Sequence, residues 1–158
     1  AAKASESSLV LSGYGRSMPG HPLLEPGRII HFPVDFGPPS GVLPHFVILA
    51  DCRDNHYFVF IIRSEPTEWQ KTNAEARQHM VVIDKESHTF LVHDSLTNCG
   101  ELTPIRMFSV VQHIREKPAD VKCKISDDVC KTILATIEGS KLLSLDQKEG
   151  IKKYLGDM

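Results

Sequence analysis

Residues 45–64 have the sequence HFVILADCRDNHYFVFIIRS, and this stretch decides the fold class. Residues 45–50 are apolar at nearly every position, which predicts a central strand that is buried on both faces. Residues 56–64 are dense in aromatic and β-branched side chains and carry the strongest strand signal in the chain. The polar residues 51–55 predict a turn, so we expect the two strands to run antiparallel.

Weaker strand signals lie on both sides of this pair. Residues 28–34 (RIIHFPV) predict a first strand, and the proline in it suits an edge strand or a strand end. The polar residues 65–78 predict a long loop, with or without a short helix. Residues 79–83 and 88–93 flank a polar turn, and together they predict a hairpin.

The segment that follows is compatible with more than one structure. A turn or a single helical turn is expected within residues 102–108, around Pro104. Residues 110–115 fit either a sixth strand or the continuation of that helix, because their periodicity matches both.

Two short amphipathic helices are expected at the C-terminal end. Ser126 can cap a helix that has two aspartates in its first turn and that ends at Gly139. Residues 144–147 (SLDQ) form a capping box for a second helix, which ends at Gly156. Successive short strands followed by helices cannot form a parallel βαβ sheet. The sequence therefore predicts an α+β fold, a small and partly open antiparallel β-barrel of five to six strands with C-terminal helices.

The chain divides into two parts. Residues 1–27 are rich in small, polar, glycine and proline residues and predict an extended arm. Residues 28–158 form a single domain that contains the barrel and the helices. A length of 158 residues suits one domain with a substantial core.

Charge and composition limit the classes of function. The formal net charge is −2, so no field of the whole molecule attracts nucleic acid, and any basic groove has to be local. The longest apolar runs are strand-sized, and the N-terminus has no charged-then-apolar signal segment, so we expect a cytoplasmic protein with no membrane partner. The four cysteines form no CxxC pair and the eight histidines are scattered, so we expect reduced thiols, no metal and no other cofactor.

Several short patterns occur in the order found in the PemK/MazF toxin family. Residues 26–30 (PGRII) resemble the "G-D-I-hydrophobic" strand that opens that family's domain. The glycine- and proline-containing loop 37–41, followed by residues 43–49 (LPHFVIL), is similar to its loop and "R-P-hydrophobic" strand. Residues 58–64 resemble its strand that ends in threonine or serine. With the hairpin, the segment 93–105 and the helix start at Ile125–Ser126, the similarity covers residues 26–138.

The resemblance implies an SH3-like barrel, commonly a homodimer, that cleaves single-stranded RNA without a metal and has an antitoxin or other protein partner. Such cleavage needs a base for the 2′-OH proton, an acid for the leaving oxygen and a cation for the phosphorane charge. In the family, an arginine ahead of the second strand and a threonine or serine after the third carry much of this. By position the hydroxyl residue is Ser64, whereas the place of the arginine falls on Pro44, beside His45.

The candidate catalytic residues are His45, Ser64 and Arg63. His45 can act as a general acid or base, and Arg63 or Arg53 can supply the charge that Pro44 does not. Arg63 and Ser64 are adjacent, so their side chains serve one site only if the strand ends or bulges there. Four further residues are candidates for RNA binding, because a basic side chain can meet phosphates and an aromatic one can stack on a base. The candidate substrate-binding residues are Arg53, Trp69, Arg106 and Arg115.

Three other functions fit the same residues. The chain can be a catalytically weakened relative that still binds RNA. A non-catalytic SH3-like module that binds a protein is favoured by the missing arginine and the near-neutral charge. A hydrolase with Cys52 or Cys99 as nucleophile has only the residue types in its favour.

Overall fold

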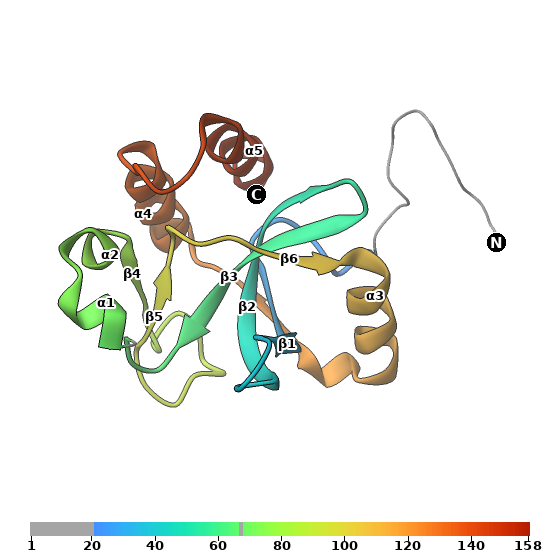
Figure 1. The fold of residues 1–158 in the computed structure, drawn as a ribbon. Helices are drawn as coiled ribbons and strands as arrows, with labels where there is room; N and C mark the ends of the chain where they lie inside the picture. The colour runs from blue at the N-terminus through green and yellow to red at the C-terminus, as the bar shows by residue number, and fades with distance from the viewer. Residues whose placement is uncertain (1–20, 67) are drawn as a thin grey trace.

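The computed structural model describes residues 21–66 and 68–158. Residues 1–20 of the predicted arm and the side chain of Trp69 lie outside the described part. Strands and helices alternate irregularly along the described chain (Figure 1). The elements are β1 (Arg28–Asp35), β2 (Val42–Arg53), β3 (His56–Arg63), α1 (Glu68–Thr72), α2 (Ala74–Gln78), β4 (Met80–Ile83), β5 (Ser95–Asn98), β6 (Thr103–Arg106), α3 (Met107–Glu116), the 3-10 turn η1 (Pro118–Asp120), β7 (Val121–Lys124), α4 (Asp127–Glu138) and α5 (Leu145–Leu155).

One curled antiparallel sheet organises these elements. Within the described residues it has seven strands in the order β4-β5-β3-β2-β1-β7, and β6 pairs with the remaining half of β3. The central strand β3 pairs with β2 along one side. On its other side it pairs with β6 near His56 and with β5 near Arg63. Because β3 is shared in this way, the sheet curls into a half-barrel (Figure 1). The predicted α+β class and antiparallel barrel-like sheet are confirmed, with more than the five to six strands expected.

The predicted central hairpin is confirmed, with a tighter turn than expected. The strand β2 continues to Arg53, which pairs with His56, and only Asp54 and Asn55 form the turn. Both turn residues have positive φ angles, 54° and 61°, as a two-residue turn with the twist of a hairpin requires. A register shift between Leu49 and Asp51 adds a bulge to β2, and a bulge increases the local bend of a sheet.

Helices cover both faces of the sheet, so each face carries its own hydrophobic core (Figure 1). Alternate residues of a strand point to opposite faces, and accordingly Ile48 belongs to one core while Val47 and Leu49 belong to the other. The first core is closed by α4 and α5, and the second by α3.

The two C-terminal helices begin and end where their caps predict. The Ser126 side chain accepts a hydrogen bond from the amide of Val129, and α4 ends at Gly139. The capping box of α5 is complete: the Ser144 hydroxyl accepts from the amide of Gln147, whose side chain accepts from the amide of Ser144. These signals are local, which is why they predict the helices so well.

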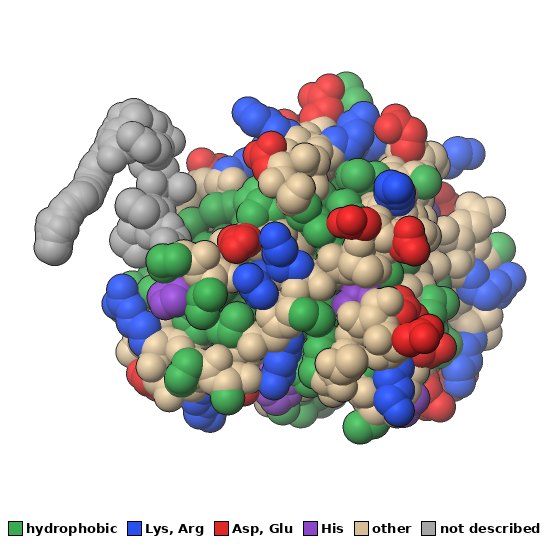
Figure 2. All heavy atoms as spheres, turned by 180° about the vertical axis from the view of Figure 1, so that it is seen from behind, with side chains coloured by type: hydrophobic (Ala, Val, Ile, Leu, Met, Phe, Trp, Pro, Cys, Tyr) green, Lys and Arg blue, Asp and Glu red, His purple; other side chains and the backbone are tan. Residues whose placement is uncertain are grey.

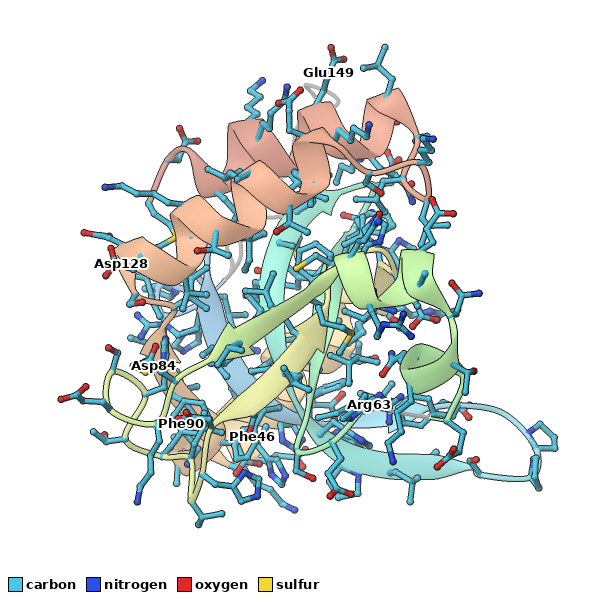
Figure 3. All side chains as sticks on the ribbon, turned by 90° about the vertical axis from the view of Figure 1, so that its left-hand side faces the viewer. Phe46, Arg63, Asp84, Phe90, Asp128 and Glu149 are labelled. Atoms are coloured by element: carbon cyan, nitrogen blue, oxygen red, sulfur yellow. The ribbon has the colours of Figure 1, made fainter. Side chains whose placement is uncertain are left out.

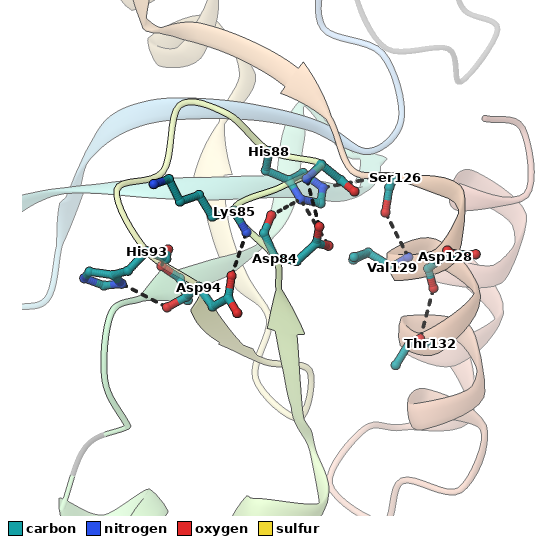
Figure 4. Close-up of polar contacts among 11 residues, drawn as sticks. Asp84, Lys85, His88, His93, Asp94, Ser126, Asp128, Val129 and Thr132 are labelled. Atoms are coloured by element: carbon teal, nitrogen blue, oxygen red, sulfur yellow. Dashed lines mark hydrogen bonds and ion pairs between the residues drawn. The ribbon is translucent and has the colours of Figure 1, made fainter.

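The predicted hairpin of 79–83 with 88–93 is wrong in its second strand. The partner of β4 is β5, at Ser95–Asn98, and the residues between them form a chain of turns. His88 is fully buried: its Nδ1 donates to the carbonyl of Asp84, and its Nε2 accepts from the amide of Ser126 (Figure 4). A residue that is buried by a contact with another element cannot be recognised from the alternation of its own segment.

Four other segments are settled by the structure. Residues 65–78 contain two short helices, α1 and α2. Of the two alternatives for residues 110–115 the helix is correct, since they lie in α3. The four-residue strand β7 carries too short a pattern to be predicted, and it pairs with β1. Residues 21–27, expected to end the arm, lie against the sheet, where Leu24 is buried and the Gly27 amide donates to the carbonyl of Leu49.

None of the helices in the described residues has the length and apolar character needed to cross a membrane.

A candidate active site at the ends of β1, β2 and β3

One pocket brings together the three candidate catalytic residues. It has a volume of about 400 Å³ and lies where β1, β2 and β3 meet the loop after β3. Its walls are His31 from β1, residues 44–46 from β2 and residues 62–66 from the end of β3. Figure 3 shows Phe46 and Arg63 at the end of the sheet that lies away from α4 and α5.

The strand register sorts these residues onto two faces of the sheet. The side chains of His31, Phe46 and Ile62 lie on the face of the first core, whereas those of His45 and Arg63 lie on the other face, against Phe36. Phe46 on β2 lies opposite His31 on one side and opposite Ile62 on the other. The strand β3 ends at Arg63, so Ser64 follows in a bend and is released from the alternation of the strand. Arg63 and Ser64 both contribute to the wall of the pocket.

His45 sits in an environment that favours its neutral form. Its ring meets the ring of Phe36 edge-on at 5.1 Å, and its Nδ1 is 3.5 Å from the carbonyl of Leu43. Burial lowers the pKa of His45, and the nearby Arg63 and His31 lower it further, while the Leu43 carbonyl opposes the shift. With the Nδ1 proton directed at Leu43, Nε2 carries the free lone pair, so His45 is suited to accept a proton at neutral pH.

An arginine does reach the pocket, although Pro44 occupies the position where the family resemblance places one. The guanidinium of Arg63 lies over the Phe36 ring, 5.4 Å from its centroid, and acts electrostatically on His45. Glu65 is also part of the pocket wall. Arg63 and Glu65 are therefore the two permanently charged residues of the pocket wall as described.

His31 is a pocket residue that the sequence did not reveal. Its ring packs on Phe46 with centroids 4.8 Å apart, and Phe46 in turn packs on Phe90 at 4.7 Å. Its Nδ1 faces Oδ1 of Asp120 at 3.8 Å. The available signal was a polar residue between Ile30 and Phe32 in the strand RIIHFPV, and a histidine without a functional role gives the same signal.

Three of the four candidate substrate-binding residues, Arg53, Arg106 and Arg115, are not part of this pocket wall. Arg53 forms ion pairs with Asp51 at 3.3 Å and with Asp146 at 2.9 Å. Arg106 lines a second pocket, of about 510 Å³, beside the β2–β3 turn, and Arg115 lies in α3. Trp69 lies in α1, a few residues after the pocket wall. Over the face shown in Figure 2, acidic and basic side chains are interspersed, so that face has no broad basic surface.

The cysteines are poorly placed to act as nucleophiles. All four are free in the structure. Cys99 is fully buried, and burial raises its pKa. Burial, with the nearby Asp51, raises the pKa of Cys52 to about 11, which leaves almost no thiolate at neutral pH. Among the residues that the structure describes, no group of three or more His, Cys, Asp or Glu side chains is arranged to hold a metal ion.

Comparison with known proteins finds no family model and no curated protein that matches the chain.

Proposed function

We propose that this protein is a PemK/MazF-like, SH3-like barrel that cleaves single-stranded RNA in the cytoplasm without a metal ion. The observation that carries the proposal is the grouping of an imidazole, a guanidinium and a hydroxyl at the neighbouring ends of β2 and β3, where His45, Arg63 and Ser64 all contribute to the wall of one pocket. The low net charge is compatible with this function, since the cation is supplied locally by Arg63.

The pocket residues suit cleavage by the 2′-hydroxyl of the RNA itself. His45 Nε2 takes the 2′-OH proton, and the 2′-oxygen attacks the adjacent phosphorus. Arg63 and the Ser64 hydroxyl stabilise the negative charge that builds up on the phosphoryl oxygens. The bond from phosphorus to the 5′-oxygen then breaks, and the leaving oxygen takes up a proton. The products are a 2′,3′-cyclic phosphate and a 5′-hydroxyl.

A second candidate function is a non-catalytic module that binds a protein partner. The observation in its favour is the second pocket, where Phe108 exposes 66% of its surface beside Met107. An exposed aromatic side chain at a pocket rim is a common anchor for a peptide. This pocket holds His56 and Arg106 but no hydroxyl or imidazole arranged as in the first.

The experiment that separates the two functions is cleavage of a long single-stranded RNA in EDTA. The wild-type protein is compared with His45→Ala, Ser64→Ala and the matched control His56→Ala, which removes a histidine from the second pocket. We expect cleavage by the wild type and the control, and a loss of about 10²–10⁴-fold in His45→Ala. Absence of cleavage by the wild type at any concentration would reject the nuclease and leave the binding module.

A further inference from the structure

The second pocket lies at the opposite end of β2 from His45. Its volume of about 510 Å³ is within the range of sites that bind ligands. The wall consists of the β2–β3 turn, the start of β3, the end of β6 and the start of α3, into which β6 leads directly (Figure 1). The lining residues are Asp54, Asn55, His56, Arg106, Met107 and Phe108.

Two backbone connections hold this wall in place. His56 of β3 and Arg106 of β6 are partners in the antiparallel register. The amide of Met107 donates to the carbonyl of Asn55 at 2.9 Å, which ties the start of α3 to the β2–β3 turn. The pocket is therefore formed by the fold itself, and a partner binds to a surface that is already ordered.

The apolar part of the wall is Phe108, which exposes 66% of its surface. The residues of α3 that belong to the second core lie on its buried face, and Phe108 lies off that face. A single exposed apolar residue is common on protein surfaces. Phe108 differs because it lines a cavity, so that an apolar side chain placed in the cavity can contact its ring and leave water.

The charged part of the wall is Arg106. Its side chain is exposed, and within residues 21–66 and 68–158 its guanidinium has no hydrogen-bond or ion-pair partner. Arg53, in contrast, is held by Asp51 and Asp146. Asp54 lies in the same wall but forms no ion pair with Arg106 in the described chain. A partner that covers the pocket takes this cation out of water, which is unfavourable unless the partner brings an anion to it.

His56 adds a hydrogen-bond acceptor. Its Nδ1 lies 2.8 Å from the carbonyl oxygen of Asp54. Because a carbonyl oxygen only accepts, Nδ1 carries the ring proton, and Nε2 of the neutral ring can accept from a partner's N–H group. The pocket therefore offers an apolar ring, an unpaired cation and an acceptor side by side.

We propose that this pocket binds a protein partner through a segment in which a bulky apolar side chain lies next to an acidic one. Phe108 contacts the apolar side chain, Arg106 pairs with the carboxylate, and His56 Nε2 accepts from a backbone N–H group of the segment. The inference rests on the second candidate function, the binding module, and names the chemistry of its partner. It does not depend on the pocket that holds His45.

A nucleic-acid strand fits this pocket less well than an acidic peptide. Successive phosphates require several cations, whereas Arg106 is the one permanent cation of the wall as described. The carboxylate of Asp54 opposes it in the same wall. One carboxylate beside one apolar group matches the charge that is present.

Titration of the isotope-labelled full chain with two peptides, followed by NMR of the backbone amides, tests the proposal. One peptide has the sequence Gly-Ser-Glu-Phe-Glu-Ser with blocked ends, and in the other both glutamates are replaced by glutamine. The variants are Arg106→Gln and Phe108→Ser. The matched control is Arg115→Gln, which removes the same charge at the other end of α3, outside the pocket wall. A uridylate hexamer is titrated for comparison.

We expect the wild type to bind the glutamate peptide about two- to fivefold more tightly than the glutamine peptide, with the amide shifts centred on the pocket wall. Arg106→Gln should bind the two peptides equally, because the ion pair is lost. Phe108→Ser should weaken the binding of both peptides about tenfold or more, because the apolar contact is lost. Arg115→Gln should match the wild type.

The contrary results overturn different parts of the account. If the wild type binds both peptides equally at this pocket, the binding module stands and the acidic partner is wrong. If neither peptide shifts these amides, the binding module at this pocket is rejected together with the inference, whereas RNA cleavage is decided by its own assay. If the uridylate hexamer shifts them more strongly than the glutamate peptide, the pocket binds nucleic acid instead. If Arg115→Gln loses the preference as Arg106→Gln does, the preference comes from overall charge and not from the pocket.

Discussion

Replacement of His88 by alanine should strongly destabilise the protein. His88 is fully buried and joins two parts of the chain, the turns after β4 and the start of α4 (Figure 4). Its Nε2 accepts from the amide of Ser126 at 3.1 Å, and its Nδ1 donates to the carbonyl of Asp84 at 2.7 Å. The same turns carry Phe90, which packs on Phe46 in the pocket wall.

The magnitude follows from what alanine removes. A buried amide that loses its acceptor costs about 1–3 kcal/mol. Loss of a buried ring leaves a cavity, and large-to-small changes in a core cost about 2–5 kcal/mol. Because the loop can relax, we expect a total of about 3–5 kcal/mol. For a domain of this size that lowers Tm by about 6–20 °C.

His88→Gln is the matched variant, because its side-chain oxygen can accept from the Ser126 amide as Nε2 does. We expect it to recover at least half of the loss. The measurement is urea unfolding followed by circular dichroism, with hydrogen exchange of the Ser126 amide as the local readout. If His88→Ala and His88→Gln are equally unstable, or if His88→Ala loses less than about 1 kcal/mol, the hydrogen bond to α4 does not have this importance.

Three further predictions concern the pocket and the thiols. Arg63→Gln should weaken the binding of single-stranded RNA, and Glu65→Gln should strengthen it, each by about 0.5–1 kcal/mol or two- to fivefold in Kd. Fluorescence-anisotropy titration measures both changes, and both should shrink as the salt concentration rises. Because the pKa of His45 is lowered and its neutral form is the base, kcat/KM for cleavage should stay constant as pH falls to the ordinary histidine value of 6.5 and decline only below it. In Arg63→Gln that decline should begin at higher pH, and an unchanged pH profile would show that Arg63 does not act on His45. A thiol reagent at pH 8 should label the exposed Cys123 of the folded protein first and leave RNA cleavage intact. Loss of cleavage on labelling of Cys52 would instead support Cys52 as a nucleophile.

Local signals in the sequence were sufficient for much of the fold. The hairpin of β2 and β3 combines two strong strand patterns with a turn, and the C-terminal helices begin at side-chain caps a few residues away. The candidates His45, Arg63 and Ser64 came from the family resemblance, and their neighbouring positions follow from the pairing of β2 with β3. Where strand pattern and turn chemistry agree over a short span, distant contacts have little to change.

What could not be predicted depends on contacts between distant segments. His88 is buried by α4, which begins nearly forty residues later in the chain, and so its segment forms turns in place of a strand. The strand β7 exists because it pairs with β1, and that pairing brings Asp120 to His31. Arg53 was a reasonable candidate for phosphate binding until the fold placed Asp51 and Asp146 beside it. The partners of these residues are set by tertiary structure.

The most direct test of RNA cleavage at this pocket is to identify the new ends of the RNA fragments. Single-stranded RNA is incubated with the wild-type protein in EDTA, and the fragments are analysed by mass spectrometry. We expect 2′,3′-cyclic phosphate and 5′-hydroxyl ends that disappear with His45→Ala. Fragments with 5′-phosphate ends, or cyclic-phosphate ends that persist undiminished in His45→Ala, would contradict attack by the 2′-hydroxyl with His45 as its base.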